Sequence, residues 1–339
     1  MRTQHARPFS RRRFLGGLTL VGTAGLLGLR PAPVVAEPPP ETTKIKLFKS
    51  ESICVAPQYI AEELLKAEGF AEVTYVPVTI TDIAPALASG AIDIGLWMVA
   101  PLAIQIDRGD PITALAGVHV GCFELFGTER VRAIRDLKGK TVAVTGMGLT
   151  QHVFLSSMVA YVGLDPRRDV HFVVHPSADG KRLLAEGKVD AYLGFPPDPQ
   201  ELRERQIGHV LVNSAVDRPW SQYFCCLAVA HRGFAQKHPV ATKRALRAIL
   251  KAADLCAQAP ERAAGLLVEG GFTARRDWAL QSLTALPYNQ WRELNPEDTL
   301  RFYALRLHEA GMIKATPQKI IAQGTDWRFL TALKKELKQ

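Results

Sequence analysis

Residues 87–93, Leu-Ala-Ser-Gly-Ala-Ile-Asp, and residues 184–190, Leu-Ala-Glu-Gly-Lys-Val-Asp, follow one pattern. In each, an apolar pair ends a helix, a glycine caps the helix, and an apolar residue begins the next strand. Each strand then carries an aromatic residue near its far end, Trp97 or Phe195, and a proline follows. A chance likeness between two ordinary helix-to-strand turns is the alternative. The repeat predicts two similar α/β lobes.

The segments around the two copies alternate between strand and helix patterns. Around the first copy we expect strands at 45–48, 73–78 and 92–98, and helices at 57–68 and from 81. Around the second copy we expect strands at 141–145, 170–174 and 190–195, and helices from 151 and at 180–185. This alternation is typical of an α/β fold with a mostly parallel sheet. Because ligands of such sheets bind at the carboxyl ends of the strands, two facing lobes predict a closing cleft between them.

The amino-terminal segment has the form of a twin-arginine export signal. Residues 10–16, Ser-Arg-Arg-Arg-Phe-Leu-Gly, precede an uncharged apolar run at 17–29. That run is too short to span a bilayer as a helix, and small residues before Ala36 suit signal peptidase. A basic tail before a membrane anchor is the alternative. We therefore expect the twin-arginine export machinery to be a partner, cleavage near Ala36 and a periplasmic location; no cysteine precedes Cys54, which argues against a lipid anchor.

The charge of the chain is concentrated in that signal. The chain has 42 Lys and Arg against 33 Asp and Glu, a net charge of +9. Six of the arginines lie within residues 1–36, which contain no acidic residue, so 36 basic residues remain beyond the signal. No basic run interleaved with aromatic residues is present, and nucleic acid is therefore not an expected partner.

Three further motifs resemble a known family. Residues 163–166, Gly-Leu-Asp-Pro, the repeated turn, and residues 195–197, Phe-Pro-Pro, are similar to those of periplasmic solute-binding proteins of ABC importers for nitrate, sulfonate and taurine. The similarity runs from about residue 44 to 311, and the family includes relatives tied to thiamine-pyrimidine precursors. It implies a type 2 periplasmic binding fold with two α/β lobes, two crossing strands and a ligand cleft. It also implies no cofactor, a membrane permease as partner, a monomer, and no catalysis in most members.

The resemblance and the element pattern together set the expected domain boundaries. The crossing strands are expected at His119–Phe126 and Tyr223–Val229. The expected segments are a signal peptide at 1–36, a proline-rich linker at 37–43, the first part of lobe 1 at 44–126, an inserted lobe 2 at 127–224, and a return to lobe 1 with carboxyl-terminal helices at 225–339.

Candidate ligand contacts follow the predicted strands. Hydroxyls and carboxylates come after the first two strands, an aromatic wall ends the third, and Glu124 lies in the first crossing strand. These candidates are Ser50, Glu51, Ser52, Thr81, Asp82, Trp97, Met98, Glu124 and Phe195. Thr81 or Asp82 is alternatively a helix cap, and core packing is the alternative for Trp97 and Met98. If two of the three carboxylates face inward, the ligand should carry an amine or another cationic end.

The turn at residues 146–152, Gly-Met-Gly-Leu-Thr-Gln-His, is the strongest single candidate. Glycines allow backbone N–H groups to approach a ligand, and a helix N-terminus favours an anion. The turn resembles the family's Gly-Ser-Ser-x-His turn, with Gly148, Thr150 and His152 at matching positions and Gln151 between them. Leu149 stands where a hydroxyl is often found, which disfavours a sulfonate. A core histidine is the alternative for His152.

Five cysteines complete the candidate residues: Cys54, Cys122, Cys225, Cys226 and Cys256. They form no CxxC motif and no Cys/His spacing typical of zinc, so no metal site is predicted. The two crossing strands place Cys122 near Cys225 or Cys226, and a disulfide with one of them is our hypothesis. Buried free thiols are the alternative.

The residues favour binding over catalysis. His119 with Glu124, and His171 with His175, are the nearest approaches to a catalytic pair, and neither has a spacing that chemistry demands. We therefore expect an exported, non-enzymatic protein that captures a small organic or anionic solute for an ABC importer. The alternatives are an enzyme related to thiamine-pyrimidine precursors and a ligand-sensing lobe of a membrane receptor. Taurine-like zwitterions, alkyl sulfonates and substituted pyrimidines all fit the predicted cleft.

Overall fold

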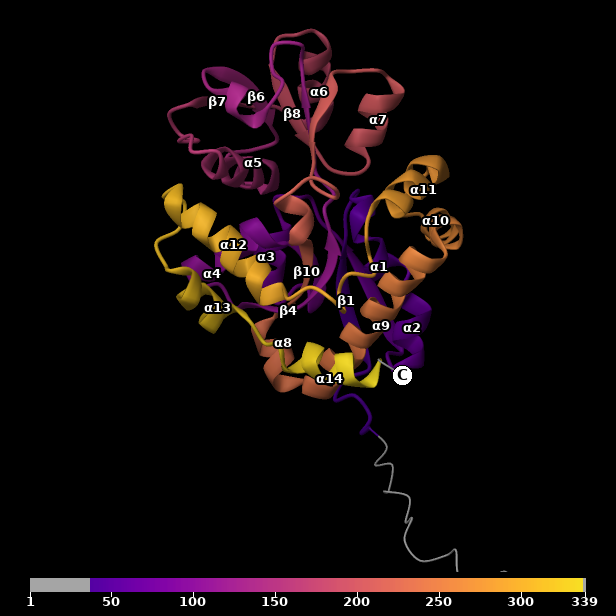
Figure 1. The fold of residues 1–339 in the computed structure, drawn as a ribbon. Helices are drawn as coiled ribbons and strands as arrows, with labels where there is room; N and C mark the ends of the chain where they lie inside the picture. The colour runs from indigo at the N-terminus through magenta and orange to yellow at the C-terminus, as the bar shows by residue number, and fades with distance from the viewer. Residues whose placement is uncertain (1–36, 338–339) are drawn as a thin grey trace, which may run out of the picture. The chain divides into compact units, whose positions relative to one another are not determined.

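A computed structural model describes residues 37–337 (Figure 1). The predicted export signal and its cleavage site at Ala36 lie outside the described residues. The chain divides into two units, residues 1–38 and 39–339, and every element named below belongs to the second. Between residues 37 and 337, no helix is both long enough and apolar enough to cross a membrane.

The second unit is built from ten strands and from helices of very different length. The strands are β1 (Lys44–Lys49), β2 (Glu72–Pro77), β3 (Ile94–Met98), β4 (Ile112–Val120), β5 (Glu124–Gly127), β6 (Lys140–Val144), β7 (Val170–Val174), β8 (Ala191–Gly194), β9 (His209–Asn213) and β10 (Phe224–His231). The α-helices are α1 (Ala56–Tyr59), α2 (Glu62–Ala67), α3 (Ile83–Ala88), α4 (Val99–Arg108), α5 (Thr150–Tyr161), α6 (Ser177–Ala185), α7 (Asp198–Glu204), α8 (Arg232–Lys237), α9 (Pro239–Gln258), α10 (Pro260–Glu269), α11 (Arg276–Ala285), α12 (Pro296–Glu309), α13 (Pro317–Gly324) and α14 (Arg328–Glu336). Short 3-10 turns are η2 (Ile53–Val55), η3 (Ile134–Leu137) and η4 (Trp220–Gln222).

The strands pair in three sheets. Strands β1 and β2 pair in parallel, and β10 lies antiparallel between β3 and β4. The third sheet has the order β7-β6-β8-β5-β9, in which β6 is parallel to β7 and β8 while β5 is antiparallel to β8 and β9. The expectation of a mostly parallel sheet is therefore wrong around β5 and β10. Both strands lie where the chain passes between the sheets, and both run against their neighbours.

The two copies of the repeated turn make the same hydrogen bonds. Gly90 and Gly187 end their helices with positive φ angles of +74° and +66°. In the first copy, Asp93 Oδ2 accepts a hydrogen bond from the Lys46 backbone N–H at 2.8 Å, and the Asp93 N–H donates to the Lys46 carbonyl at 2.9 Å. In the second copy, Asp190 bonds the Thr141 backbone in the same two ways, at 2.9 and 2.7 Å. The repeat therefore closes two equivalent β-α-β units.

The predicted first crossing strand is interrupted. Strand β4 ends at Val120 and β5 begins at Glu124, because Gly121 and Cys122 adopt φ angles of +64° and +146°. The Ser214 side chain satisfies the backbone at this break: its Oγ accepts from the N–H groups of Cys122 and Phe123 at 3.2 and 2.9 Å. The return strand β10 starts one residue later than predicted and extends two residues further. The chain therefore turns sharply between the two larger sheets.

The helix expected at residues 57–68 is divided into α1 and α2, and a buried glutamine anchors the first of them. The structure has α1 and α2 there, separated at Ile60 and Ala61, and the turn η2 precedes them. The Gln58 amide nitrogen donates to the Phe48 carbonyl at 2.7 Å, and its Oε1 accepts from the Leu96 N–H at 2.6 Å. Gln58 is fully buried and thereby links α1 to both β1 and β3.

The carboxyl-terminal helices begin at identifiable caps. Helix α9 begins at Pro239, and the Glu41 carboxylate accepts from the N–H groups of Val240 and Ala241 at 2.9 and 2.8 Å. The Asn295 side chain caps α12 by accepting from the Glu297 N–H at 3.0 Å. A carboxylate or amide oxygen at such a position satisfies helix donors that have no partner within the helix.

Aromatic side chains join the sheets through α5. Figure 1 shows α5 between strands β6–β8 and helices α4 and α12, and α5 contacts both helices. The Phe154 ring lies 4.6 Å from the Phe123 ring, 5.9 Å from Trp220 and 5.7 Å from Tyr303. All four side chains are buried. The main hydrophobic core is thus continuous from the three-stranded sheet to the five-stranded one.

A glycine on β4 makes room for a buried ring, which gives a test of the packing. A Cβ at Gly117 would lie 2.2 Å from the ring of Phe224, which is fully buried. We expect Gly117→Ala to lower the free energy of unfolding by about 2 kcal/mol through overpacking. The matched control is Gly265→Ala in α10, where nothing lies within 4 Å of the added Cβ. This control should gain about 0.5–1 kcal/mol from helix propensity. Equal effects of the two substitutions in urea unfolding would contradict this packing.

Candidate ligand-binding site

Loops from the ends of β1 and β8 meet in the structure. The Ile53 N–H, just after the β1 loop, donates to the Pro196 carbonyl at 3.3 Å. Beside this contact, the Phe195 ring lies 5.5 Å from that of Phe123. The contact brings the neighbourhoods of Ser52 and Phe195, both candidates from sequence, together from different sheets.

The three candidates of the β1 loop differ in their surroundings. The Ser50 backbone N–H donates to the Tyr59 hydroxyl at 2.9 Å, and that hydroxyl donates to the Ser50 carbonyl at 2.9 Å. The Ser52 hydroxyl lies 3.1 Å from Cys54 Sγ. The Glu51 side chain is exposed. Tyr59 therefore fixes the start of the loop, and Ser52 faces the cysteine cluster described below.

The candidates at the end of β3 are part of the interior. Trp97 and Met98 are each 5% exposed. Met98 lies opposite Cys226 in the β3–β10 register. The Trp97 indole nitrogen is buried without a hydrogen-bond partner among residues 37–337. Core packing explains the burial of both side chains, and the free indole N–H leaves Trp97 a donor for a polar ligand.

Thr81 and Asp82 lie apart from these groups, at the start of α3. Both are exposed. The Thr79 hydroxyl lies 2.6 Å from that of Thr81 and donates to the Asp82 carboxylate. Asp82 occupies the N-cap position of α3, but its side chain accepts no hydrogen bond from the helix. The structure brings neither residue to the β1 and β8 loops through a hydrogen bond.

Glu124 already has a cationic partner. Its side chain is buried at the start of β5 and forms an ion pair with Arg203 of α7, whose guanidinium also lies 5.9 Å from the centre of the Phe126 ring. Glu51 and Asp82 are exposed. An amine on a ligand would therefore meet one buried carboxylate of the three and would compete with Arg203 for it.

The glycine turn before α5 is organised around His152. Gly148, with φ of +76°, donates its N–H to His152 Nδ1 at 3.0 Å. Since Nδ1 accepts, the neutral imidazole carries its proton on Nε2, which can donate to a ligand. Burial lowers the pKa of His152, which favours this neutral form. The ring packs edge-on against Phe172, with centroids 4.8 Å apart.

Gln151 and Thr150 are buried at the first turn of α5. Gln151 Oε1 accepts from the Thr145 N–H at 3.2 Å, and its amide nitrogen donates to the Leu193 carbonyl at 2.7 Å and lies 3.2 Å from the Tyr192 hydroxyl. These bonds hold the turn against β8. Gln151 thus positions the glycine turn, and its amide group is engaged by the protein itself.

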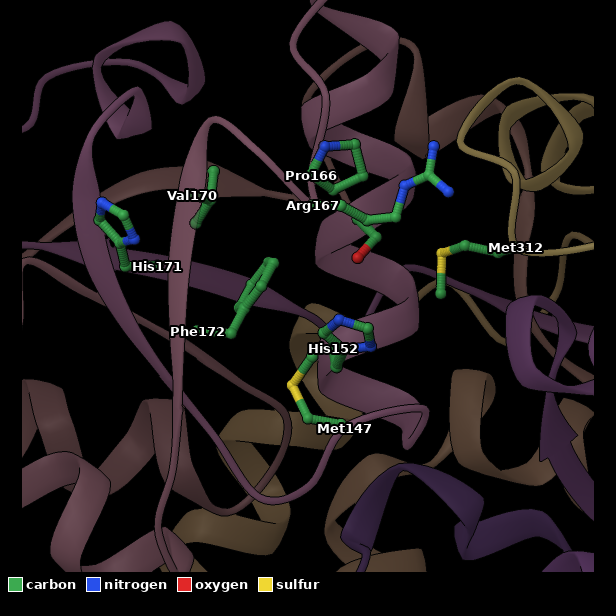
Figure 2. Close-up of a pocket in the computed structure, with 9 residues that line it drawn as sticks. Met147, His152, Pro166, Arg167, Val170, His171, Phe172 and Met312 are labelled. Carbon is green, nitrogen blue, oxygen red and sulfur yellow. The ribbon is translucent and has the colours of Figure 1, made fainter.

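A cavity of about 510 Å³ lies beside this turn (Figure 2). The side chains that line it are Met147, His152, Ser156, Pro166, Arg167, Val170, His171, Phe172 and Met312. In Figure 2, Met147 and Phe172 lie next to His152, Arg167 and Met312 lie on the other side, and His171 points away from Phe172 across β7. An imidazole donor and a guanidinium beside thioether and aromatic groups suit a small anion with an apolar part.

Sequence reasoning found His152 of this cavity but missed Arg167, Met147 and Met312. Two of these had a signal in the sequence. Met147 lies within the glycine turn itself, and Arg167 directly follows the Gly-Leu-Asp-Pro motif. Met312 lies after α12, far along the chain, and had no such signal.

A buried ionic network joins α6 to α7. Lys181 Nζ lies 2.8 Å from Asp198 Oδ1 and also pairs with Glu201. Asp198 further accepts from the Tyr192 hydroxyl at 2.5 Å and from the Ser177 hydroxyl at 2.9 Å. Because Tyr192 also bonds Gln151, this network reaches the glycine turn.

The network predicts a large effect of removing its cation. Lys181→Met would leave the buried Asp198 carboxylate without its charge partner, and we expect a loss of about 3 kcal/mol in the free energy of unfolding. Lys188→Met is the matched control, because Lys188 is 65% exposed and its ion pair with Glu186 lies at the surface. That control should change stability by less than about 1 kcal/mol. Chemical denaturation of both variants measures the difference, and a Lys181→Met variant as stable as the control would refute the network's role.

Cys122, Cys225 and Cys226 lie where the chain passes between the sheets. All five cysteines are buried free thiols. Cys122 Sγ lies 3.0 Å from Cys225 Sγ. Burial acts to raise the pKa of Cys225, but hydrogen bonds with Cys122 and Cys226 lower it to about 7. Of the two partners left open by the sequence, the geometry favours Cys225.

We therefore predict a Cys122–Cys225 disulfide under oxidising conditions. A thiolate within reach of a second thiol is the species that forms such a bond. Closing a loop of about a hundred residues should stabilise the fold by about 3–5 kcal/mol. Non-reducing peptide mapping after incubation with oxidised glutathione should find this link and leave Cys256 as a thiol. Complete alkylation of all five cysteines in the unfolded, oxidised sample would contradict the prediction.

Solved structures similar to this chain share its fold. The periplasmic nitrate-binding protein NrtA from Synechocystis PCC 6803 matches with a TM-score of 0.72 at 16% identity, over 89% of this chain and 90% of that one. The alkanesulfonate-binding protein SsuA from Xanthomonas axonopodis pv. citri, solved with bound MOPS, matches with a TM-score of 0.69 at 17% identity, over 85% and 99%. The chain therefore has the periplasmic binding protein fold, as the sequence predicts.

The sequence of the chain is similar to that of a group of enzymes and to one protein family. A 4-amino-5-hydroxymethyl-2-methylpyrimidine phosphate synthase of Saccharomyces cerevisiae is 26% identical over 214 residues, which is 58% of this chain. The match spans about three-fifths (61%) of that enzyme's own length. Residues 39–267 match the profile of the NMT1-like family. Since this match covers well over half of the sequence, the chain belongs to the NMT1-like family.

Proposed function

We propose that this protein is an exported solute-binding protein that captures a small organic anion and delivers it to an ABC importer. The observation that carries the proposal is the cavity of about 510 Å³ beside the glycine turn, which His152 of α5 and Arg167, beyond the end of α5, both line. A neutral imidazole donor and a fixed positive charge bind an anion without requiring any chemical step. The fold shared with nitrate- and sulfonate-binding proteins supports the same role.

The remaining candidates complete the proposed cleft. Ser52 and Phe195 lie on loops that touch through Ile53 and Pro196, and Trp97 offers an indole N–H that has no partner within residues 37–337. In this proposal, residues 127–224 form the inserted lobe, and binding closes it upon the remainder of residues 44–339. The protein acts as a monomer in the periplasm after twin-arginine export and removal of residues 1–36, and its membrane partner is the importer's permease.

A pyrimidine-precursor synthase is the second candidate function. The observation that favours it is the 26% identity to enzymes of that name from Saccharomyces cerevisiae. Such an enzyme would alter what it binds, whereas a binding protein releases its solute unchanged. The two functions therefore differ in the chemical identity of the recovered ligand.

Thermal unfolding of the chain with a panel of solutes tests the binding proposal. The panel contains nitrate, bicarbonate, taurine, alkyl sulfonates, aminopyrimidines and amino acids. A true ligand at about 100 times its dissociation constant should add about 2.7 kcal/mol to the free energy of unfolding. We expect the stabilising compounds to be anions with a small apolar part. If aminopyrimidines alone stabilise the protein, the proposal of an anion ligand is wrong.

A pair of neighbouring arginines provides the matched variants for this test. Arg167 and Arg168 both interact with Asp165 and are both largely exposed, but only Arg167 lines the cavity. Arg167→Gln should weaken binding of the anion about 10-fold or more, because a charge-assisted hydrogen bond is lost. Arg168→Gln should bind as the parent does. If calorimetry finds equal binding by both variants, the ligand does not bind in this cavity. If mass spectrometry recovers a chemically converted ligand, the synthase function is favoured.

A further inference from the structure

Two cysteines and a histidine from three separate elements meet in the interior. Cys226 of β10 lies directly opposite His119 of β4 in the strand register, so their side chains leave the same face of the sheet. Cys54, in the turn η2 after the β1 loop, approaches the same point. One ligand atom of each residue lies within 4.8 Å of the other two. The three side chains are 3%, 0% and 2% exposed for Cys54, His119 and Cys226.

The histidine of this group has an unsatisfied nitrogen. His119 Nδ1 lies 3.4 Å from the Val120 carbonyl, whereas Nε2 is buried without a hydrogen-bond partner among residues 37–337. A buried polar atom without a partner costs about 1–3 kcal/mol. Packing against the Tyr288 ring, 5.3 Å away, does not satisfy this nitrogen. A bond to a metal ion would satisfy it.

The donor set selects the kind of ion. Two thiolates and an imidazole bind zinc well, whereas calcium and magnesium prefer oxygen ligands. Ligands of a tetrahedral zinc ion are about 3.3–3.8 Å apart, from metal–ligand distances of about 2.0–2.3 Å. Side-chain movements of about 1 Å would therefore bring the three ligand atoms into range. The linear sequence hides this set, because its members lie at positions 54, 119 and 226.

We propose that Cys54, His119 and Cys226 form a binding site for one Zn²⁺ ion. The ion joins the turn after β1 to β4 and β10, the two strands that lead into and out of the five-stranded sheet. Ser52, whose hydroxyl lies 3.1 Å from Cys54 Sγ, links this site to the β1 loop. Zinc therefore stabilises the folded protein and fixes one wall of the candidate cleft. The zinc site stands independently of whether the protein is an importer component.

Metal binding to the full chain tests the proposal. The chain is purified with a reductant, stripped with a chelator and titrated with Zn²⁺, and separately with Co²⁺ as a spectroscopic probe. We expect one zinc per chain, a thiolate-to-cobalt charge-transfer band and a rise in the unfolding temperature with zinc. Cys54→Ser and Cys226→Ser should each lower zinc affinity about 100-fold or more, since a thiolate ligand is lost.

Cys256→Ser is the matched control, because Cys256 is also a fully buried free thiol but lies outside the cluster. It should retain zinc affinity and the cobalt band. Circular dichroism checks that each variant folds. If Cys54→Ser or Cys226→Ser does not fold, the cobalt spectrum of the parent chain tests the zinc site instead. A reduced parent chain that binds no zinc, or that binds cobalt without a charge-transfer band, overturns the proposal. So does unchanged affinity in folded Cys54→Ser and Cys226→Ser variants.

Discussion

One aspartate in each half of the fold ties a helix-to-strand turn to the first strand of its β-α-β unit. Asp93 closes the turn before β3 by accepting a hydrogen bond from the Lys46 backbone of β1. Asp190 closes the turn before β8 in the same way, with the Thr141 backbone of β6. A carboxylate that accepts a backbone N–H sets the register at one end of the unit. The opposite strand ends then lie at a common edge. The candidate cleft depends on this alignment, because its loops follow β1, β3, β6 and β8.

The secondary structure of these two β-α-β units is also the part of the fold that the sequence predicts best. Their strands and helices are defined by local periodicity and by glycines at helix ends, so β1, β2 and β7 agree with the expected ranges within a residue or two. The break between β4 and β5 could not be predicted in this way. It depends on Ser214, which lies 91–92 residues further along the chain and satisfies the backbone of Cys122 and Phe123. The antiparallel pairing of β10 depends in the same way on distant partners.

The candidate site shows the same division between local and distant information. The glycine turn and His152 are local features, and both take part in the cavity's wall. The partners that decide their chemistry are distant in sequence. Arg203, which neutralises Glu124, lies 79 residues from it, and Met312 reaches the cavity from beyond α12. A sequence can therefore nominate a turn for anion binding but cannot show which charges remain available there.

An irregularity in strand β10 explains how the buried cysteines are arranged. Side chains of an ideal strand alternate between faces, so only one of Cys225 and Cys226 should approach Cys122. The β10–β4 register shifts between Phe224 and Cys226, because Phe224 lies opposite Val120 and Cys226 opposite His119. Cys225 is thus the extra residue of a bulge, which relaxes the alternation rule. The bulge lets Cys225 approach Cys122 while Cys226 faces His119, so redox chemistry and metal binding can use different thiols of one buried cluster.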